Sequence, residues 1–384
     1  MSRSLTNLTP DLYTAVDIIS RELVGFIPAV SSDMTHERAA IGETVYSPVT
    51  ASASASDITA AVTPPDDGDN TLTATPLTIT KARRVPVRIN GEQQRILNDS
   101  VGWTTVRAME FAQAMRTLVN EVEKDLAGLY VKASRAYGTA GTSPFGSTPK
   151  LADAANMQKI LDDNGAPQTD RQLIINTGAA VNLATLTQLT NVNEAGSADL
   201  LRRGVVSDLF GFQVRKSAQV ANHGAQAGAG YLVNLTAGYV AGDKVIVLDT
   251  GTGAIAAGSV ITIADDPSGG MYVVAEDFAG GAGSITIAAP GLTGAAVNNK
   301  AVTVANPFSA NMAFSRSAMY LATRAPATPD VGDSADDAMV VTDPVSGLSF
   351  EIREYRQYRQ VQYEVSIAWG VACVKPEHCA ILLG

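Results

Sequence analysis

The 384-residue chain contains few of the side chains that most often carry out chemistry. It has two cysteines, Cys373 and Cys379, and three scattered histidines, His36, His223 and His378. No second cysteine pair completes a metal site, no GxSxG motif is present, and the neighbours His378 and Cys379 point to opposite sides of an extended chain. We therefore expect no enzymatic activity, no cofactor and no metal. So few cysteines favour a reducing compartment with free, buried thiols over a disulfide.

Charged residues and long apolar runs are also scarce. Charged residues make up 17% of the chain and the formal net charge is −10, whereas a protein that grips nucleic acid through its phosphates needs clustered Lys and Arg. No apolar run approaches the ~20 residues that cross a bilayer, and the N-terminus lacks the apolar segment of a signal peptide. We expect a soluble protein made in a cytoplasm, with no membrane contact.

The longest regular pattern is the stretch 104–137, which predicts one amphipathic helix. No proline interrupts it, and at 1.5 Å per residue it would span about 50 Å. Such a length suits a beam across an extended subunit. The apolar stripe consists of Val106, Met109, Met115, Val119, Val122, Leu126 and Leu129.

Two segments before this helix do not resemble the start of a core. Thr9-Pro10-Asp11 predicts the start of a short helix that ends near Gly25, and we interpret it as an arm. Residues 43–97 are rich in Ser, Thr, Ala and Asp and then become β-like, which predicts a long two-stranded loop that projects from the body. Its tip, residues 64–69, favours a turn over a calcium loop, because the spacing does not match an EF-hand.

The middle of the chain alternates helix and strand signals. We predict a helix over 151–165, a buried strand over 171–177, a helix over 178–189 and a strand that opens at 211–214. The single glycine of INTGAAVN favours a plain turn over a nucleotide site. Residues 223–305 are dense in glycine and hold short β runs at regular spacing, which predicts an inserted small barrel or sandwich.

The last third predicts the best strand of the protein. ANMAFSRSAMYLATRAP (310–326) predicts a helix or a strand followed by a helix. Apolar residues then alternate over 361–373, a strand of about 43 Å. We expect this strand to pack along the long helix as a spine.

In the order of its parts the chain resembles the major capsid (coat) proteins of tailed double-stranded DNA phages. The resemblance is greatest to the podophage branch, whose coat protein carries an inserted β-barrel domain. It covers nearly the whole chain and rests on LLRRGVVSDLFGFQVRKSAQV, on the strands GSVITIAD, MYVVAE and AGSITIAAP, on FSRSAMYLATRAP, and on the terminal stretch 341–382.

The resemblance implies an α+β fold and a structural function. The domains implied are an N-arm (1–42), an E-loop (43–97), the spine helix with a peripheral domain (98–150), an axial domain (151–220), an inserted β-barrel domain (221–305) and a return through the axial domain to peripheral strands (306–384). The subunit would self-assemble through pentamers and hexamers into an icosahedral shell, by way of a procapsid in the host cytoplasm. Scaffolding and portal proteins are implied partners, and the virion shell would enclose DNA without sequence-specific binding.

Two groups of charges are candidate contact residues. Our first hypothesis pairs Arg83, Arg84 and Arg88 of the E-loop with Glu110, Glu121 or Asp125 on the spine helix of an adjacent subunit, and solvated surface charge is the alternative. The second places Asp11, Asp17 and Glu22 of the arm against a basic scaffold helix.

Another structural class competes with the capsid interpretation. A tail, decoration or surface-adhesion protein built on glycine-rich β repeats would explain the composition of the middle segment. The long helix and the long C-terminal strand do not fit that class.

A covalent Lys–Asn link between subunits would require Lys81, the one lysine of the 43–97 segment.

Overall fold

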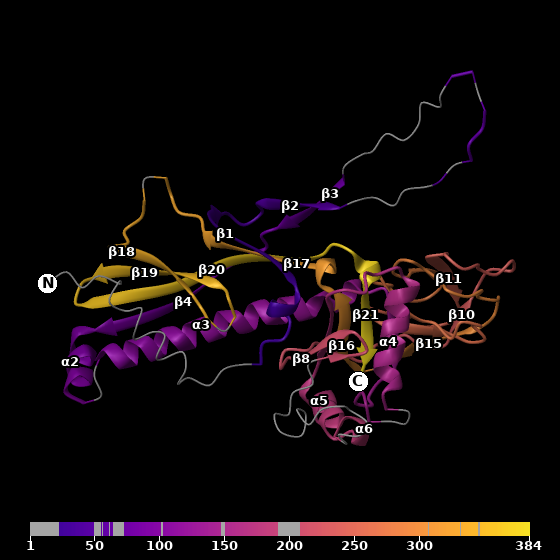
Figure 1. Cartoon of the computed structure of the whole chain (residues 1–384), viewed down its shortest axis with the longest axis horizontal. Coiled ribbons are helices and arrows are strands. Elements are labelled where there is room, and N and C mark those ends of the chain that lie inside the picture. The colour runs from indigo at the N-terminus through magenta and orange to yellow at the C-terminus, as the bar shows by residue number, and fades with distance from the viewer. Residues whose placement is uncertain are drawn as a thin grey trace.

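Two β-sheets and one long helix organise the chain (Figure 1). The computed structural model describes residues 23–49, 55, 57–60, 62–63, 73–100, 103–146, 150–190, 208–305, 307–330, 332–344 and 346–384. The predicted arm helix and the predicted turn at 64–69 lie outside these residues.

The first sheet has six strands, with β20 at its centre. β20 pairs with β4 along one edge, and with β19 and then β17 along the other. β18 pairs with the outer edge of β19, and β1 pairs with the outer edge of β17. The strands are β1 (Ser31–Ala39), β4 (Lys81–Asn90), β17 (Met319–Pro326), β18 (Asp337–Thr342), β19 (Ser349–Gln357) and β20 (Gln360–Cys373).

Helix α3 (Trp103–Ala127) runs along this sheet, after the shorter α2 (Gly91–Ser100) (Figure 1). The ring of Phe111 meets Tyr363 of β20 edge-on, with centroids 5.2 Å apart. At the other end the indole Nε1 of Trp369 donates a hydrogen bond of 2.9 Å to Asp125 Oδ2. The buried apolar residues between them form one core, so the predicted packing of the long strand on the long helix is confirmed.

The helix is shorter than the 104–137 prediction. It ends at Ala127, and the chain continues as the 3₁₀ helix η3 (Gly128–Lys132) and then as strand β5 (Arg135–Gly138). Glycine lowers helix propensity at this point, and β5 gains pairing partners in β21 and β13. Sheet pairing therefore overrides the helical pattern of the sequence.

The projecting part is also shorter than the predicted loop of 43–97. β2 (Thr44–Val49) and β3 (Thr73–Thr78) form a hairpin that extends away from the body (Figure 1), but β4 belongs to the six-stranded sheet. The hairpin base crosses β20 at Gly370, where a Cβ atom would lie 2.1 Å from the Thr78 carbonyl oxygen. Only glycine allows this approach.

The second sheet has thirteen strands and carries the remaining helices. β21 lies between β5 and β16, with β6, β8 and β7 following β16. The predicted helix of 151–165 and strand of 171–177 are present, although the strand ends at Ile175, and the single helix predicted over 178–189 is instead two short helices. The elements of this part are α4 (Ala152–Asp163), β6 (Arg171–Ile175), α5 (Thr177–Ala184), α6 (Thr187–Thr190), β7 (Asp208–Leu209), β8 (Phe212–Lys216), β9 (Asn222–His223), β16 (Phe308–Ser315) and β21 (Cys379–Leu383).

The glycine-rich segment forms a lobe with a core of its own, which we call the β-lobe. Its strands lie in the order β14-β11-β10-β15-β12-β13, and β13 pairs with β5 of the body. The two outer strands also meet, because Val274 bridges Ile287 and the Ala275 amide donates to the Thr286 carbonyl at 2.8 Å. The run of strands therefore closes on itself. The strands are β10 (Tyr231–Val233), β11 (Val245–Asp249), β12 (Val260–Ile263), β13 (Met271–Val273), β14 (Gly283–Thr286) and β15 (Ala301–Ala305).

The segment 310–326 contains no α-helix, which corrects the helix predicted there. β16 and β17 follow one another with only the 3₁₀ turn η4 (Arg316–Ala318) between them. Most residues of both strands are buried, seven of eight in β16 and five of eight in β17. Alanine and methionine favour helix in isolation, but a strand buried on both faces accepts them as small apolar side chains.

Within the described ranges the chain crosses between the two sheets at three places, and each crossing contains a 3₁₀ helix. These are η3, η4 and η5 (Pro376–His378), the last of which joins β20 to β21. The Val374 amide donates to the Ala318 carbonyl at 2.8 Å, and the Ser134 amide donates to the Cys379 carbonyl at 2.9 Å. The η5 crossing is therefore bonded to both of the others.

A buried carboxylate ties the start of the described chain to α3. Glu123 is 1% exposed and accepts hydrogen bonds from the amides of Gly25 at 2.6 Å, Phe26 at 2.7 Å and Ile27 at 3.0 Å. The hydroxyl of Ser217, just after β8, donates a fourth at 2.8 Å. One side chain on the helix thus holds two distant segments of the chain.

We predict that Glu123→Gln destabilises the folded chain by about 2–4 kcal/mol, because the amide group accepts fewer bonds and turns a donor toward buried amides. Urea unfolding of the isolated chain measures this change. Glu121→Gln is the matched control, since Glu121 is 41% exposed and lies 3.5 Å from Arg83; it should cost less than about 1 kcal/mol. Equal losses in the two variants would contradict the anchoring role of Glu123.

Candidate functional site

The described residues offer surfaces more than catalytic groups. No cluster of three or more His, Cys, Asp and Glu side chains suited to a metal ion occurs within the described ranges. The arrangement that remains is a set of charged and apolar surfaces on the spine, the hairpin and the β-lobe.

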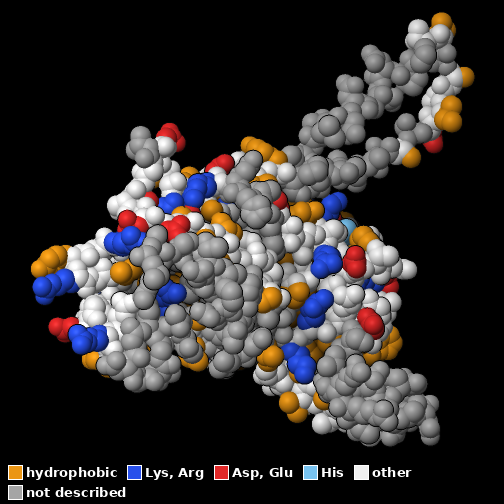
Figure 2. All heavy atoms as spheres, turned by 60° about the vertical axis from the view of Figure 1, so that its left-hand side comes forward, with side chains coloured by type: hydrophobic (Ala, Val, Ile, Leu, Met, Phe, Trp, Pro, Cys, Tyr) orange, Lys and Arg blue, Asp and Glu red, His pale blue; other side chains and the backbone are white. Residues whose placement is uncertain are grey.

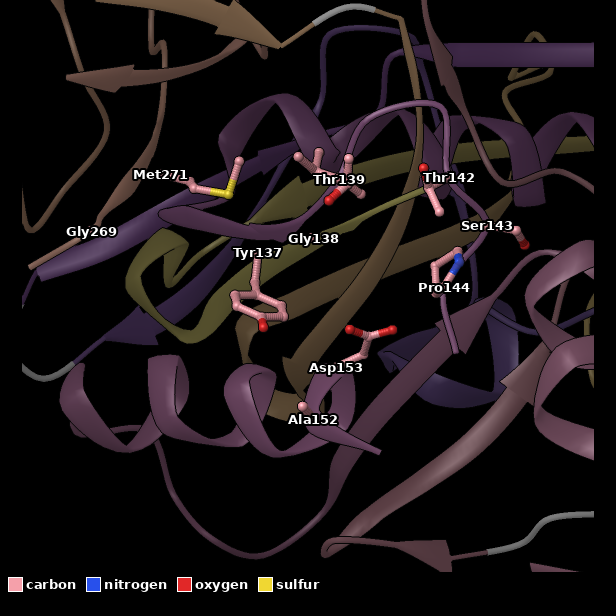
Figure 3. Close-up of a pocket in the computed structure, with 11 residues that line it drawn as sticks. Tyr137, Gly138, Thr139, Thr142, Ser143, Pro144, Ala152, Asp153, Gly269 and Met271 are labelled. Atoms are coloured by element: carbon pink, nitrogen blue, oxygen red, sulfur yellow. The ribbon is translucent and has the colours of Figure 1, made fainter. Parts of the chain in front are cut away.

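A cavity of about 310 Å³ lies where β5, α4 and the β-lobe meet (Figure 3). Tyr137 and Asp153 reach into the space between the strand and the helix (Figure 3). Asp153 Oδ2 accepts a hydrogen bond from the Phe145 amide at 2.7 Å, and burial raises the pKa of its carboxyl despite that bond. Asp153 already accepts a backbone hydrogen bond, so we assign it a structural role.

The three arginines predicted to face a neighbour lie in β4 and not on the projecting hairpin. All three find partners within the chain, together with Lys81 at the start of the strand. The contacts are Lys81 Nζ to Asp125 Oδ1 at 2.7 Å, Arg83 Nε to Glu121 Oε2 at 3.5 Å, Arg84 Nη1 to Glu364 Oε2 at 2.7 Å and Arg88 Nη2 to Gln362 Oε1 at 2.9 Å.

These contacts bring two of the predicted acids together with β4. Glu121 and Asp125 pair with β4 of their own chain, because β4 packs beside α3. The arginine heads remain accessible: the side chains of Arg83 and Arg84 are 58% and 57% exposed. Their predicted role toward a neighbour stays a prediction, and it now has to compete with pairing inside the chain.

Glu110, the third predicted acid, lies nearer the N-terminal end of α3. Burial raises the pKa of its carboxyl, and its Oε2 atom is buried without a hydrogen-bond partner among the described residues. The predicted scaffold contacts Asp11, Asp17 and Glu22 lie outside the described residues.

Charged side chains on the face turned forward in Figure 2 are mixed in sign. Lys and Arg are scattered over this face and do not gather into one continuous basic patch (Figure 2). The described side chains on this face therefore form no continuous basic groove for a phosphate backbone.

The hairpin presents apolar side chains to solvent. Tyr46 of β2 is 67% exposed, and Ile58 and Val62, beyond the strands, are fully exposed. An isolated two-stranded hairpin is marginal in water, and exposed apolar groups gain free energy when another surface covers them. The hairpin is therefore a candidate contact surface.

A buried histidine joins the β-lobe to the body. His223 is 5% exposed and stacks on Phe308, with ring centroids 4.9 Å apart. Its Nδ1 lies 2.9 Å from the Tyr130 hydroxyl, and its Nε2 lies 3.0 Å from Ser259 Oγ. Burial lowers the pKa of the imidazole, so the neutral ring is the form that fits this junction.

Sequence reasoning missed both Glu123 and His223. Glu123 had a detectable signal: it lies four residues after Val119 and three before Leu126, so a carboxylate occupies the apolar stripe of α3. His223 had none, because its partners come from three segments that only the fold brings together.

Comparison with solved structures identifies the fold. A capsid structure of the cyanophage P-SCSP1u superposes with a TM-score of 0.52 and 12% identity, over 95% of this chain and 89% of that chain. A structure from Mycobacterium phage Che8 superposes with a TM-score of 0.49 and 14% identity, over 95% of this chain and 92% of that chain. The mature capsid of bacteriophage PhiM1 superposes with a TM-score of 0.45 and 11% identity, over 94% of this chain and 86% of that chain. The P-SCSP1u likeness shows that this chain has the fold of phage capsid proteins, a mixed fold of helices and many strands.

Sequence comparison adds no relative. No family model matches the chain, and no curated protein matches it. Within the described ranges, none of the helices is both long enough and apolar enough to span a membrane.

We predict that the His223 junction makes stability fall in acid. Because the pKa of His223 is lowered on folding, the unfolded chain takes up the proton first, so the stability from the neutral ring is present above about pH 6.5 and is lost as the pH falls toward the lower, folded pKa. Urea unfolding midpoints at about pH 7.5 and pH 5.5 measure this loss.

His223→Gln should show a smaller loss between the two pH values than the unchanged chain. His378→Gln should also reduce the loss, because burial lowers the pKa of His378 as well, but that contribution arises at η5, so comparison of the two variants assigns each part of the pH dependence to its site. A pH dependence that is the same with and without His223 would contradict the prediction.

Proposed function

We propose that this chain is the shell-forming subunit of a tailed double-stranded DNA phage, whose copies close into an icosahedral capsid around the genome. The observation that carries the proposal is the likeness to the P-SCSP1u capsid structure along 95% of this chain. It is supported by an architecture in which a 25-residue helix and a 14-residue strand form a beam and a hairpin projects from it (Figure 1).

The hairpin and the beam suggest how neighbouring copies meet. The exposed apolar side chains of the hairpin need a surface to lie on, and the α3–β4 face of an adjacent copy offers both apolar and charged groups. Each such contact would bury about 1,200–2,000 Å², and closure of the shell adds many modest contacts together. Arg83, Arg84 and Arg88 would then exchange or share carboxylates with the neighbour.

The finer assignment is to the podophage branch with an inserted β-barrel domain. The β-lobe supports it, because six strands close on themselves around a separate core and lie between strands that belong to the body. Residues 221–305 are the proposed insertion.

The remaining domain divisions follow the resemblance, with one change. The N-arm covers 1–42, the spine and peripheral domain 98–150, the axial domain 151–220 and the return 306–384, while the E-loop of 43–97 would project only as far as β3. Scaffolding and portal proteins are proposed partners of assembly in the host cytoplasm, and the arm acids Asp11, Asp17 and Glu22 are the proposed scaffold contacts.

We predict that the chain, expressed alone and together with the neighbouring phage genes, forms closed shells roughly tens of nanometres across. Negative-stain electron microscopy of the purified material measures this outcome directly. Small rings, trimers or fibres in both preparations would reject the proposal and favour a tail, decoration or adhesion protein.

A charge swap separates the two roles of Arg84. Arg84→Glu places a second carboxylate beside that of Glu364. The double change Arg84→Glu with Glu364→Arg restores a pair of opposite charges inside the chain. We predict that shell yield stays low in both variants while the monomer unfolds at an unchanged urea midpoint in the double variant, because the neighbour's carboxylates still meet a reversed charge. Recovery of shell yield in the double variant would confine Arg84 to a role within its own chain.

A further inference from the structure

The two cysteines of the chain lie in contact with each other. Their sulfur atoms are 3.5 Å apart, and both are free thiols. Cys379 is completely buried, whereas Cys373 is partly exposed. A disulfide requires a sulfur separation of about 2.05 Å, so a shift of roughly 1.5 Å would bring the sulfur atoms to bonding distance.

Their place in the fold makes this contact consequential. Cys373 is the last residue of β20, in the six-stranded sheet, and Cys379 is the first residue of β21, in the thirteen-stranded sheet. The five residues between them are the η5 crossing, whose amides bond to the Ala318 carbonyl in the η4 crossing. A bond between the sulfur atoms would therefore join the two sheets where the chain passes from one to the other.

We propose that Cys373 and Cys379 are an oxidation site, at which a hydroperoxide converts the two thiols into a disulfide that closes the crossing between the sheets. The Cys373 sulfur attacks the peroxide, an S–O bond forms, the O–O bond breaks, and the leaving hydroxide takes up the thiol proton as water. The Cys379 sulfur then attacks the Cys373 sulfur, an S–S bond forms, the S–O bond breaks, and the leaving hydroxide takes up the Cys379 thiol proton as a second water. Two thiols and one hydrogen peroxide thus give one disulfide and two waters.

The surroundings of the two sulfurs determine which one reacts first. The hydrogen bond with Cys373 and complete burial raise the pKa of the Cys379 thiol, which keeps it protonated and out of reach of a peroxide. Cys373 is therefore the sulfur that is attacked by the oxidant, and Cys379 is the one that resolves the intermediate.

The bond would fix the geometry of the crossing more than it would raise overall stability. The loop that it closes is short, so little chain entropy is removed from the unfolded state. Its direct effect is on local opening of η5, where the Val374 amide donates to the Ala318 carbonyl and the His378 amide donates to the Lys375 carbonyl. If the chain has the proposed function, the thiols persist in the reducing host and the disulfide forms after the particle is released. The timing of oxidation rests on the proposed function, whereas the formation of the disulfide does not.

The test uses the full chain, purified in reduced form and treated with hydrogen peroxide. We expect both thiols to become inaccessible to alkylation in denaturant, with the loss of two hydrogens in intact mass, and reversal by dithiothreitol. Cleavage after Glu377, which lies between the two cysteines, should leave two fragments joined until they are reduced. Hydrogen exchange at Val374 and His378 should slow several-fold in the oxidised chain.

Two single variants test the order of the steps. Cys379→Ser should trap Cys373 as a sulfenic acid that reacts with dimedone, and Cys373→Ser should leave Cys379 as an unreacted thiol in the folded chain. Sulfinic or sulfonic acid at Cys373 of the unchanged chain with Cys379 still free, disulfide-linked dimers, or no reaction before unfolding would each overturn the proposal. The result is independent of whether the chain builds a shell.

Discussion

The placement of the chain's segments around α3 depends on one buried carboxylate. Glu123 accepts hydrogen bonds from three successive amides near the start of the described chain and from the Ser217 hydroxyl, far from them in sequence. The approach is tight enough that a Cβ atom on Gly25 would lie 2.7 Å from the Lys216 carbonyl oxygen. A charged group without partners would be costly at this depth, so the helix, the segment before β1 and the end of β8 are formed together or not at all.

Patterns that repeat along a single element were visible in the sequence. The alternation of β20 and the apolar stripe of α3 each reflect one face against one core, and their packing follows from matching lengths. The strand β6 and the helix α4 were equally readable, because glycine marks their turns. The resemblance to phage capsid proteins used the same elements in the same order, and the fold agrees with it.

Features that depend on distant partners were not visible. Residues 128–137 continue a helical pattern, yet β5 gains more from pairing with β21 and β13. Residues 81–90 look like the second arm of a loop, and only the long register with β20 places them in a sheet. The arginines of β4 therefore lie in the sheet as well. They were predicted to contact a neighbouring subunit, but they already pair with side chains of α3 and β20.

The position of β21 has a consequence for how the molecule is made. In the described sheet β21 lies between β5 and β16, paired in parallel with the first and antiparallel with the second, and it is the last of the strands in chain order. Strands translated long before it cannot join into one sheet until the ribosome has delivered these residues. Without the residues of β21, the described strands of this sheet would form two separate sheets, each with an open edge.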